Sequence, residues 1–192
     1  AFDGCSSLMY NEYDNAYYLG NSSNPYLLLM KAKDKMITSC NINVNTRFIY
    51  SDAFSDCHGL TSMVIPDGVT SIGSYAFYGC SSLTSIVIPD SVTSIGDYAF
   101  WWCRSLTSVK LPDSVTSIGE YTFWWCSSLT SIVIPDSVTS IGGDAFGYCS
   151  SLTSITFTGT VQQWNDISKG YDWNADTPIT EVHCSDGVVT SN

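Results

Sequence analysis

The sequence is poor in charge, and poorest in positive charge. Charged residues make up 13% of the chain, roughly half the share in an average globular protein. Seven lysines and arginines stand against 18 aspartates and glutamates, which gives a formal net charge of −11. Such an acidic chain repels phosphates and anionic lipids, so the composition argues against nucleic-acid binding and against adhesion to acidic membranes. We expect the acidity to keep an apolar, strand-rich chain in solution.

Sequence patterns of membrane segments, enzymes and metal sites are also missing. No apolar run approaches the ~18–20 residues of a membrane-spanning helix, so we expect no membrane insertion. The two histidines, His58 and His183, form no His-x-x-x-His pair. There is no nucleophile elbow, no phosphate-binding glycine loop and no Cys-x-x-Cys. We therefore predict no enzymatic activity, no catalytic residues, no cofactor and no metal site.

What the sequence has instead is a unit of 23 residues that is repeated almost unchanged. Clear copies begin at Leu60, Leu83, Leu106 and Leu129, with Pro, Gly, Phe and Cys at fixed offsets. A fixed period of this size is typical of a solenoid, in which each coil buries its apolar face against its neighbours. Because β-branched residues dominate the unit, we predict a β-rich solenoid with short turns or 3₁₀ segments and little α-helix.

The N-terminal part departs from the regular repeat. Residues 1–8 match the end of a unit, so we expect the chain to begin inside a repeat and to be a piece of a longer protein. Residues 1–36 combine this partial repeat with an irregular segment. Within it, the apolar runs 15–20 and 25–31 flank a polar turn, which predicts a β-hairpin. Residues 37–158 carry the regular repeats, beginning with a degenerate copy.

The C-terminal part, residues 159–192, departs from the repeat in a different way. Apolar residues lie three apart between 161 and 167, which is typical of a short helix with its N-cap at Gly159 or Thr160. Residues 179–184 then return to the strand register of the repeat. Because a solenoid needs an atypical unit to cover its last apolar face, we interpret 159–192 as a C-terminal cap of one continuous domain.

The register of the repeat also predicts which side chains form the core. In the copy that begins at Leu83, we expect Leu83, Ile86 and Ile88 to point inward and Ser85 and Val87 to point outward. Eight cysteines suggest a disulfide framework at first. The register instead places all of them on inward positions, as small buried side chains, although a disulfide between neighbouring coils stays geometrically conceivable. They are Cys5, Cys40, Cys57, Cys80, Cys103, Cys126, Cys149 and Cys184.

Two sets of acidic residues are candidates for chemistry. One row follows the proline of each unit, where hydrogen bonding to nearby backbone is the favoured role and calcium binding the alternative. Asp97 and Glu120 lie one coil apart, as a glycosidase pair would, although both positions are typical of exposed turns. The row after proline consists of Asp67, Asp90, Asp113 and Asp136.

Two variable positions of the repeat follow the inward Phe. Stacked copies turn these positions into two adjoining aromatic rows, with Tyr75, Tyr98 and Tyr121 in a further row nearby. Contiguous exposed aromatic residues are typical of binding interfaces. Alternatively, the rings pack flat on the solenoid wall or on one another. The candidate binding surface consists of Tyr78, Trp101, Trp102, Trp124, Trp125 and Tyr148.

The repeat resembles a known family. The pattern Leu-x-x-Ile-x-Ile-Pro-x-x-Val-x-x-Ile-Gly-x-x-Ala-Phe-x-x-Cys-x-x, in register over residues 37–158, looks like the BspA-like, or treponemal-type, leucine-rich repeat of bacterial surface proteins. The segments around Tyr10 and from Val161 to Cys184 look like flanking segments of this family. The resemblance implies a curved leucine-rich-repeat solenoid, secreted or attached to the cell wall, that takes part in adhesion or binds host and matrix proteins. It implies no catalytic residues.

We therefore predict a non-enzymatic binding module of an extracellular or cell-surface protein, with another protein as its partner. Two alternatives stay open. The aromatic rows could bind carbohydrate by ring stacking, or the solenoid could serve as a structural spacer that presents another domain.

Overall fold

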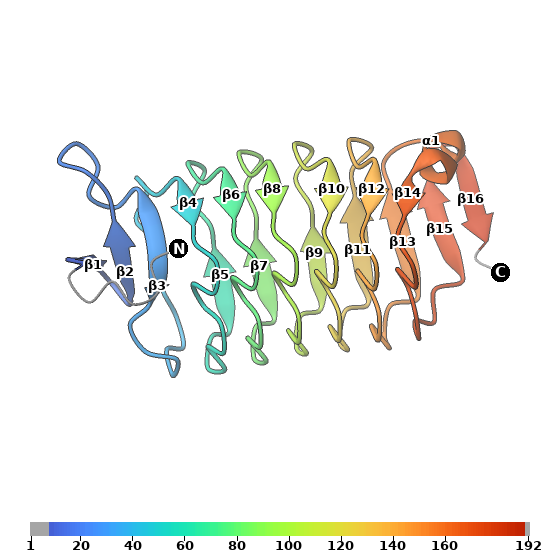
Figure 1. Cartoon of the computed structure of the whole chain (residues 1–192). Coiled ribbons are helices and arrows are strands. Elements are labelled where there is room, and N and C mark those ends of the chain that lie inside the picture. The colour runs from blue at the N-terminus through green and yellow to red at the C-terminus, as the bar shows by residue number, and fades with distance from the viewer. Residues whose placement is uncertain (1–7, 191–192) are drawn as a thin grey trace.

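The computed structural model describes residues 8–190 and shows a stack of short coils along one long axis (Figure 1). The repeat fragment expected at residues 1–7, with Cys5, lies outside the described residues. The helix is α1 (Val161–Asp166), and the strands are β1 (Asn11–Tyr13), β2 (Ala16–Leu19), β3 (Leu28–Ala32), β4 (Phe48–Ile49), β5 (Ser62–Val64), β6 (Ser71–Ile72), β7 (Ser85–Val87), β8 (Ser94–Ile95), β9 (Ser108–Lys110), β10 (Ser117–Ile118), β11 (Ser131–Ile134), β12 (Ser140–Ile141), β13 (Ser154–Phe157), β14 (Ser168–Lys169), β15 (Glu181–Cys184) and β16 (Gly187–Thr190).

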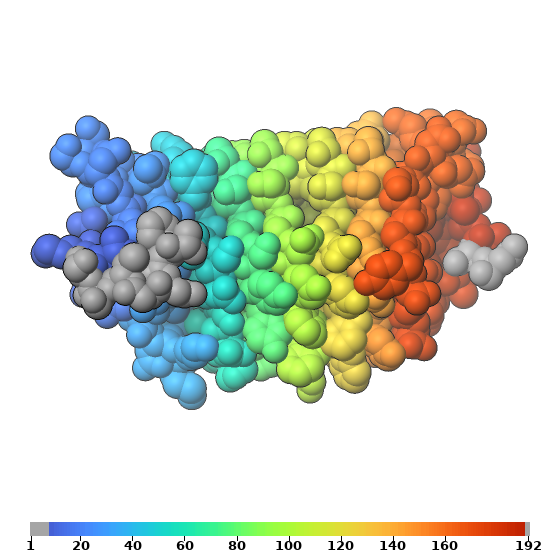
Figure 2. Space-filling model, viewed as in Figure 1, coloured from blue at the N-terminus to red at the C-terminus, as the bar shows by residue number. Residues whose placement is uncertain are grey.

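Two rows of strands set the register of the solenoid. One row contains the odd-numbered strands from β5 to β15, and the other contains the two-residue strands from β4 to β14 (Figure 1). Paired neighbours within these rows run parallel, and Ser108, Ser131 and Ser154 are partners in successive coils. The partners are 23 residues apart, so the predicted β-solenoid with 23-residue coils is confirmed. In space-filling view the coils are successive slabs of one elongated body (Figure 2).

The alternation of side chains within a coil produces the core. Leu83, Ile86 and Ile88 are buried, whereas Val87, between the last two, is 58% exposed. Pro89 follows and has no N–H to extend the strand, which ends at Val87. The predicted inward and outward faces are therefore confirmed.

Two side-chain ladders run the length of the core. The inward Phe rings of successive coils stack nearly parallel, with centroids 5.3–5.4 Å apart. Beside them, cysteine thiols donate to Phe carbonyls of the preceding coil, as Cys103 Sγ does to Phe77 O at 3.1 Å. Burial raises the pKa of the Cys149 thiol to about 12. The stacked Phe residues are Phe54, Phe77, Phe100, Phe123 and Phe146.

The described cysteines lie where the register predicted. Cys40 and the five cysteines of the repeat row are buried, and Cys184 is half-buried and packs against the core. Their thiols are free throughout residues 8–190. The cysteines therefore contribute as small core side chains.

The N-terminal end joins an antiparallel unit to the parallel stack. β2 and β3 form the predicted hairpin, with an irregularity between Tyr17 and Tyr18. β3 then pairs in parallel with β4 and so continues into the first coil. β1 adds a third, antiparallel strand that the sequence did not predict.

The C-terminal end carries the only helix of the described residues. The Thr160 hydroxyl accepts from the Gln163 N–H and the Gln163 side chain accepts from the Thr160 N–H, so the helix predicted to start here is confirmed with a capping box. Trp164 is 3% exposed and meets Phe157 at 5.4 Å and Trp173 at 5.9 Å between ring centroids. None of the helical structure in residues 8–190 has the length and apolar character needed to cross a membrane.

β15 re-enters the parallel register beside β13, as predicted, and β16 pairs with it antiparallel. The division of the chain after residues 36 and 158 stays a prediction, as does the role of residues 159–192 as a cap.

Candidate functional site

The turn between the inward Phe and Cys of each coil presents two side chains outward. The second of them adopts a left-handed backbone conformation, with φ of 63° at Trp102, 58° at Trp125 and 57° at Tyr148. The N–H of Trp102 donates to Trp124 O of the next coil at 2.9 Å, which locks neighbouring turns together. We call the first positions the inner row (Tyr78, Trp101 and Trp124) and the second positions the outer row (Trp102, Trp125 and Tyr148).

The outer-row conformation carries a cost that ring burial offsets. A left-handed conformation costs an ordinary L-residue about 1–2 kcal/mol, and Asp56 and Gly79 occupy the same position in earlier coils. Trp102 is 36% exposed, so roughly 160 Å² of its side chain is buried, worth about 4 kcal/mol as an upper figure. Packing therefore outweighs strain, and strain by itself does not mark Trp102 as functional.

All six predicted aromatic residues come together in one contiguous cluster, which we call the aromatic surface. Trp102 stacks on Tyr78, with centroids 6.0 Å apart, and Trp125 stacks on Tyr148 at 5.3 Å. In the inner row, Trp101 and Trp124 meet edge to face at 5.3 Å. Trp102 and Tyr148 are 36% and 40% exposed, and the other four rings are half-buried. The rings thus pack on one another and still reach solvent.

The inner part of the aromatic surface is extended by a row of tyrosines. Tyr75, Tyr98 and Tyr121 stack nearly parallel, with centroids 4.6 and 4.9 Å apart, and Tyr98 meets Trp101 at 5.3 Å. The Trp101 Nε1–H is buried and has no acceptor within the described residues, an arrangement that costs about 1–3 kcal/mol. This N–H faces away from solvent, so Trp101 offers a partner its ring rather than a hydrogen bond.

The tyrosine hydroxyls at the C-terminal side have partners within the chain. A hydrogen bond to Asp176 raises the pKa of the Tyr148 hydroxyl. A hydrogen bond with Tyr171, at 3.0 Å between the oxygens, raises the pKa of the Tyr121 hydroxyl. Both hydroxyls are therefore neutral at physiological pH and add no negative charge to the surface.

Arg104 is a candidate that the sequence analysis did not single out. Its guanidinium carbon lies over the Trp102 ring at 5.2 Å and over the Trp125 ring at 5.5 Å from the centroids. Neighbouring copies carry Ser81 and Ser127 at the equivalent position. The replacement of serine by arginine in this one copy could have identified Arg104 from the sequence. Arg104 borders a hollow of about 390 Å³. We call it the Arg104 hollow; its lining is Asp56, His58, Gly79, Ser81, Trp102 and Arg104.

The far side of the Arg104 hollow is held by hydrogen bonds. His58 Nδ1 lies 2.8 Å from Gly79 O, and since a carbonyl only accepts, Nδ1 carries the proton and donates. Asp56 Oδ2 accepts from Lys35 Nζ at 3.1 Å. The carboxylate of the hollow is thus already paired with a cation.

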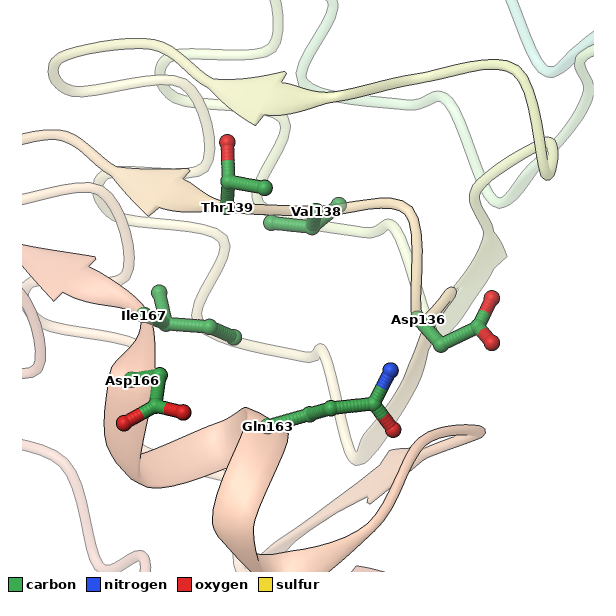
Figure 3. Close-up of a pocket in the computed structure, with 6 residues that line it drawn as sticks. All are labelled: Asp136, Val138, Thr139, Gln163, Asp166 and Ile167. Carbon is green, nitrogen blue, oxygen red and sulfur yellow. The ribbon is translucent and has the colours of Figure 1, made fainter.

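The acidic candidates all lie in turns of the coils. Asp97 Oδ1 accepts from the Glu120 N–H at 3.0 Å, so Asp97 supports the turn of the next coil. A hollow of about 170 Å³ beside α1 contains Asp136 and Asp166, but their carboxylates point away from each other (Figure 3). Between residues 8 and 190, no three His, Cys, Asp or Glu side chains gather as a metal site would require. The remaining lining of this hollow is Val138, Thr139, Gln163 and Ile167.

The face of the longer strands offers a second, different surface. Val64 is 67% exposed and Val87 is 58% exposed, and they are partners on β5 and β7. Lys110 and Val133 are partners further along the row, on β9 and β11. This face is apolar in part but contains no tryptophan, so it provides a matched control for the aromatic surface.

Comparison with known proteins places this geometry among bacterial repeat proteins. A family profile described as "BspA type Leucine rich repeat region" matches residues 47–168 as six copies. A leucine rich cell surface protein from Faecalibacterium prausnitzii A2-165 is 31% identical, with a TM-score of 0.70 over 83% of this chain and 42% of that chain. The chain therefore spans less than half of that protein's length. No curated protein sequence matches the chain.

Two further solved structures are similar. The leucine rich repeat protein of T. pallidum is 26% identical, with a TM-score of 0.61 over 76% of this chain and 73% of that chain. A leucine-rich repeat protein from Eubacterium ventriosum is 24% identical, with a TM-score of 0.74 over 89% of this chain and 50% of that chain. At that identity the second likeness shows the fold alone.

Proposed function

Because this chain belongs to the BspA-type leucine-rich repeat family, we propose that it is a non-enzymatic protein-binding module of an extracellular or cell-surface protein. The similar protein from F. prausnitzii is described as a cell surface protein, which supports this location.

The observation that carries the proposal is the contiguous aromatic surface. Its rings occupy the positions where the copies differ, whereas the core positions are almost constant. Trp, Tyr and Arg are the residues that most often dominate the energy of protein interfaces. Here Trp102, Arg104 and Tyr148 are exposed, and Trp125 contacts both Arg104 and Tyr148. A rigid aromatic surface loses little conformational entropy on binding.

Carbohydrate binding is less well supported by this geometry. A sugar ring stacks on an open aromatic face, and the outer-row indoles already have neighbours at their faces. Trp102 has Tyr78 and Arg104, and Trp125 has Tyr148 and Arg104. These neighbours leave less open ring face for a sugar, whereas the side chains of a protein partner can also pack against ring edges.

A double substitution tests the proposal. We expect Trp102→Gly with Trp125→Gly to keep the turn conformation, because Gly79 occupies the same position with φ of 67°, while the loss of ring burial lowers the free energy of unfolding. Loss of two interface tryptophans should weaken binding to a protein partner about a hundredfold or more. Affinities would be measured against a panel of extracellular proteins and a glycan array, with circular dichroism to check the fold.

The matched control is Val87→Thr with Lys110→Thr on the strand face, since Thr156 occupies the equivalent position in β13. It should leave the affinity unchanged. A protein partner bound equally well by the double Trp variant would contradict the proposal. Ligands found only on the glycan array would favour the carbohydrate alternative, and ligands in neither assay would favour the spacer.

A further inference from the structure

Arg104 is a cation that contacts aromatic rings rather than a carboxylate. Between residues 8 and 190, the ion pairs join Lys33 to Glu12, Lys35 to Asp56 and His183 to Glu181. Arg104 has none, and the same is true of Lys31, Arg47, Lys110 and Lys169. The Arg104 guanidinium is held instead by the Trp102 and Trp125 rings. Each such contact is worth about 0.5–1 kcal/mol at an exposed site.

This placement controls how the Arg104 guanidinium can meet a ligand. All five of its N–H groups lie in the plane of the group, and none points from its faces. Because Arg104 forms no ion pair between residues 8 and 190, these N–H groups remain available to a ligand along the edge of the guanidinium. Two parallel N–H groups on that edge match the two oxygens of a carboxylate. The contacts with the two rings thus order the Arg104 side chain before a ligand binds. The entropy cost of ordering this side chain would otherwise weaken binding.

The residues around Arg104 limit which kind of anion can bind to it. The Arg104 hollow measures about 390 Å³, enough for one side chain and part of its neighbours. Its only carboxylate, Asp56, is already paired with Lys35. The exposed indole edges beside it call for apolar groups next to the anion. A partner that is strongly acidic overall would be repelled by the net charge of −11.

We infer that Arg104 is the anion-binding centre of the aromatic surface and that it receives a single Asp or Glu carboxylate of a protein partner. Apolar residues on either side of this acid then cover the edges of Trp102 and Trp125. The inference rests on the proposed function, because it names the group of the partner that this surface recognises. Phosphate or a sugar carboxylate fits the fork as well, but neither brings apolar groups for the indole edges.

The test uses capped tripeptides and heteronuclear NMR of the whole chain. The probe is leucine–glutamate–leucine, and its isosteric control is leucine–glutamine–leucine. We expect the glutamate probe to shift the Arg104 side-chain N–H and the Trp102 and Trp125 indole N–H signals saturably, and the glutamine probe to shift none. A galacturonate trisaccharide and inorganic phosphate serve as the other sources of negative charge.

Two substitutions at Arg104 and one elsewhere complete the design. Arg104→Ser should abolish the shifts, and the fold tolerates Ser at this position, as Ser81 and Ser127 show. Arg104→Lys keeps the charge but loses the fork, so binding should weaken about tenfold or more. Lys110→Val makes the same change in charge as Arg104→Ser on the strand face, where Val87 and Val133 stand in other coils, and should change nothing.

Each contrary result has one meaning. Unchanged glutamate binding in Arg104→Ser, or equal loss in Lys110→Val, overturns the anion-binding centre. Binding of galacturonate or phosphate without the glutamate probe overturns the protein carboxylate as its ligand. If a protein partner needs Trp102 and Trp125 but not Arg104, the inference fails and the proposed function stands. If the probe binds Arg104 and no partner needs the tryptophans, the proposed function fails instead.

Discussion

At the scale of the residue, the repeat register accounts for side chains that composition alone would misassign. Cys57 and Cys149 look like members of a disulfide framework, yet both are completely buried with free thiols. Their burial raises the pKa from 9.0 to about 11 for Cys57 and to about 12 for Cys149. The thiolate is unstable in this core, and that instability makes the fold sensitive to high pH.

The sign of this pH dependence follows from the shift. The unfolded chain loses thiol protons near pH 9, whereas the folded chain keeps them, so stability is complete below pH 9 and falls above it. Each such thiol lowers the free energy of unfolding by up to about 1.4 kcal/mol per pH unit. Urea unfolding at pH 8, 9 and 10 should show this decline, and Cys149→Ala should make it shallower. A flat free energy of unfolding across that range would contradict the account.

At the scale of the element, the sequence predicts helices and strands that depend on local residue patterns. It misses strands that form only by pairing with another strand. The helix is predictable because Thr160 and the spacing of its apolar residues act within a few positions. β1 and β16 are not, since each short strand exists only by pairing with a neighbour. The aromatic surface follows from the period. The contact of Arg104 with Trp125 of the next coil could not be predicted, because the repeat period does not show how far a side chain extends toward the next coil.

The capping box of α1 gives a prediction at this scale. Thr160→Ala removes the acceptor for the Gln163 N–H, which should lower the free energy of unfolding by about 1 kcal/mol. Thr180→Ala is the control, because Thr180 is exposed and uses its backbone N–H to pair with Thr153. The control should stay within about 0.5 kcal/mol of the parent in urea unfolding. Equal losses in both variants would show that the cap contributes nothing specific.

At the scale of the whole molecule, the chain is a one-dimensional stack in which each coil contacts its two neighbours. Opening should therefore begin at the ends. We expect backbone amides in β11 and β12, each between two paired strands, to exchange with solvent slowest, and those in β1 and β16, at the outer edges of their sheets, to exchange fastest. Amide exchange followed by mass spectrometry checks this order. Uniform protection along the chain would show instead that the stack opens as one unit.

Stacking of the coils also brings the residues that differ between copies together in the aromatic surface. Because the coils are rigid and nearly identical, Trp102 and Trp125 stand one coil apart, with Arg104 over both rings. We propose that a protein partner binds at these side chains. Neither the core rows nor the Val87 and Lys110 side of the solenoid offers such a cluster.

Cross-saturation NMR of the complex with a protein partner tests this claim most directly, because it reports which side chains the partner touches. We expect attenuated signals for the Trp102 and Trp125 indole N–H groups, with the Trp164 indole and the Lys110 amide unaffected. Attenuation along Val64, Val87 and Lys110, with unchanged Trp102 and Trp125 signals, would place the partner on the strand face and contradict the account.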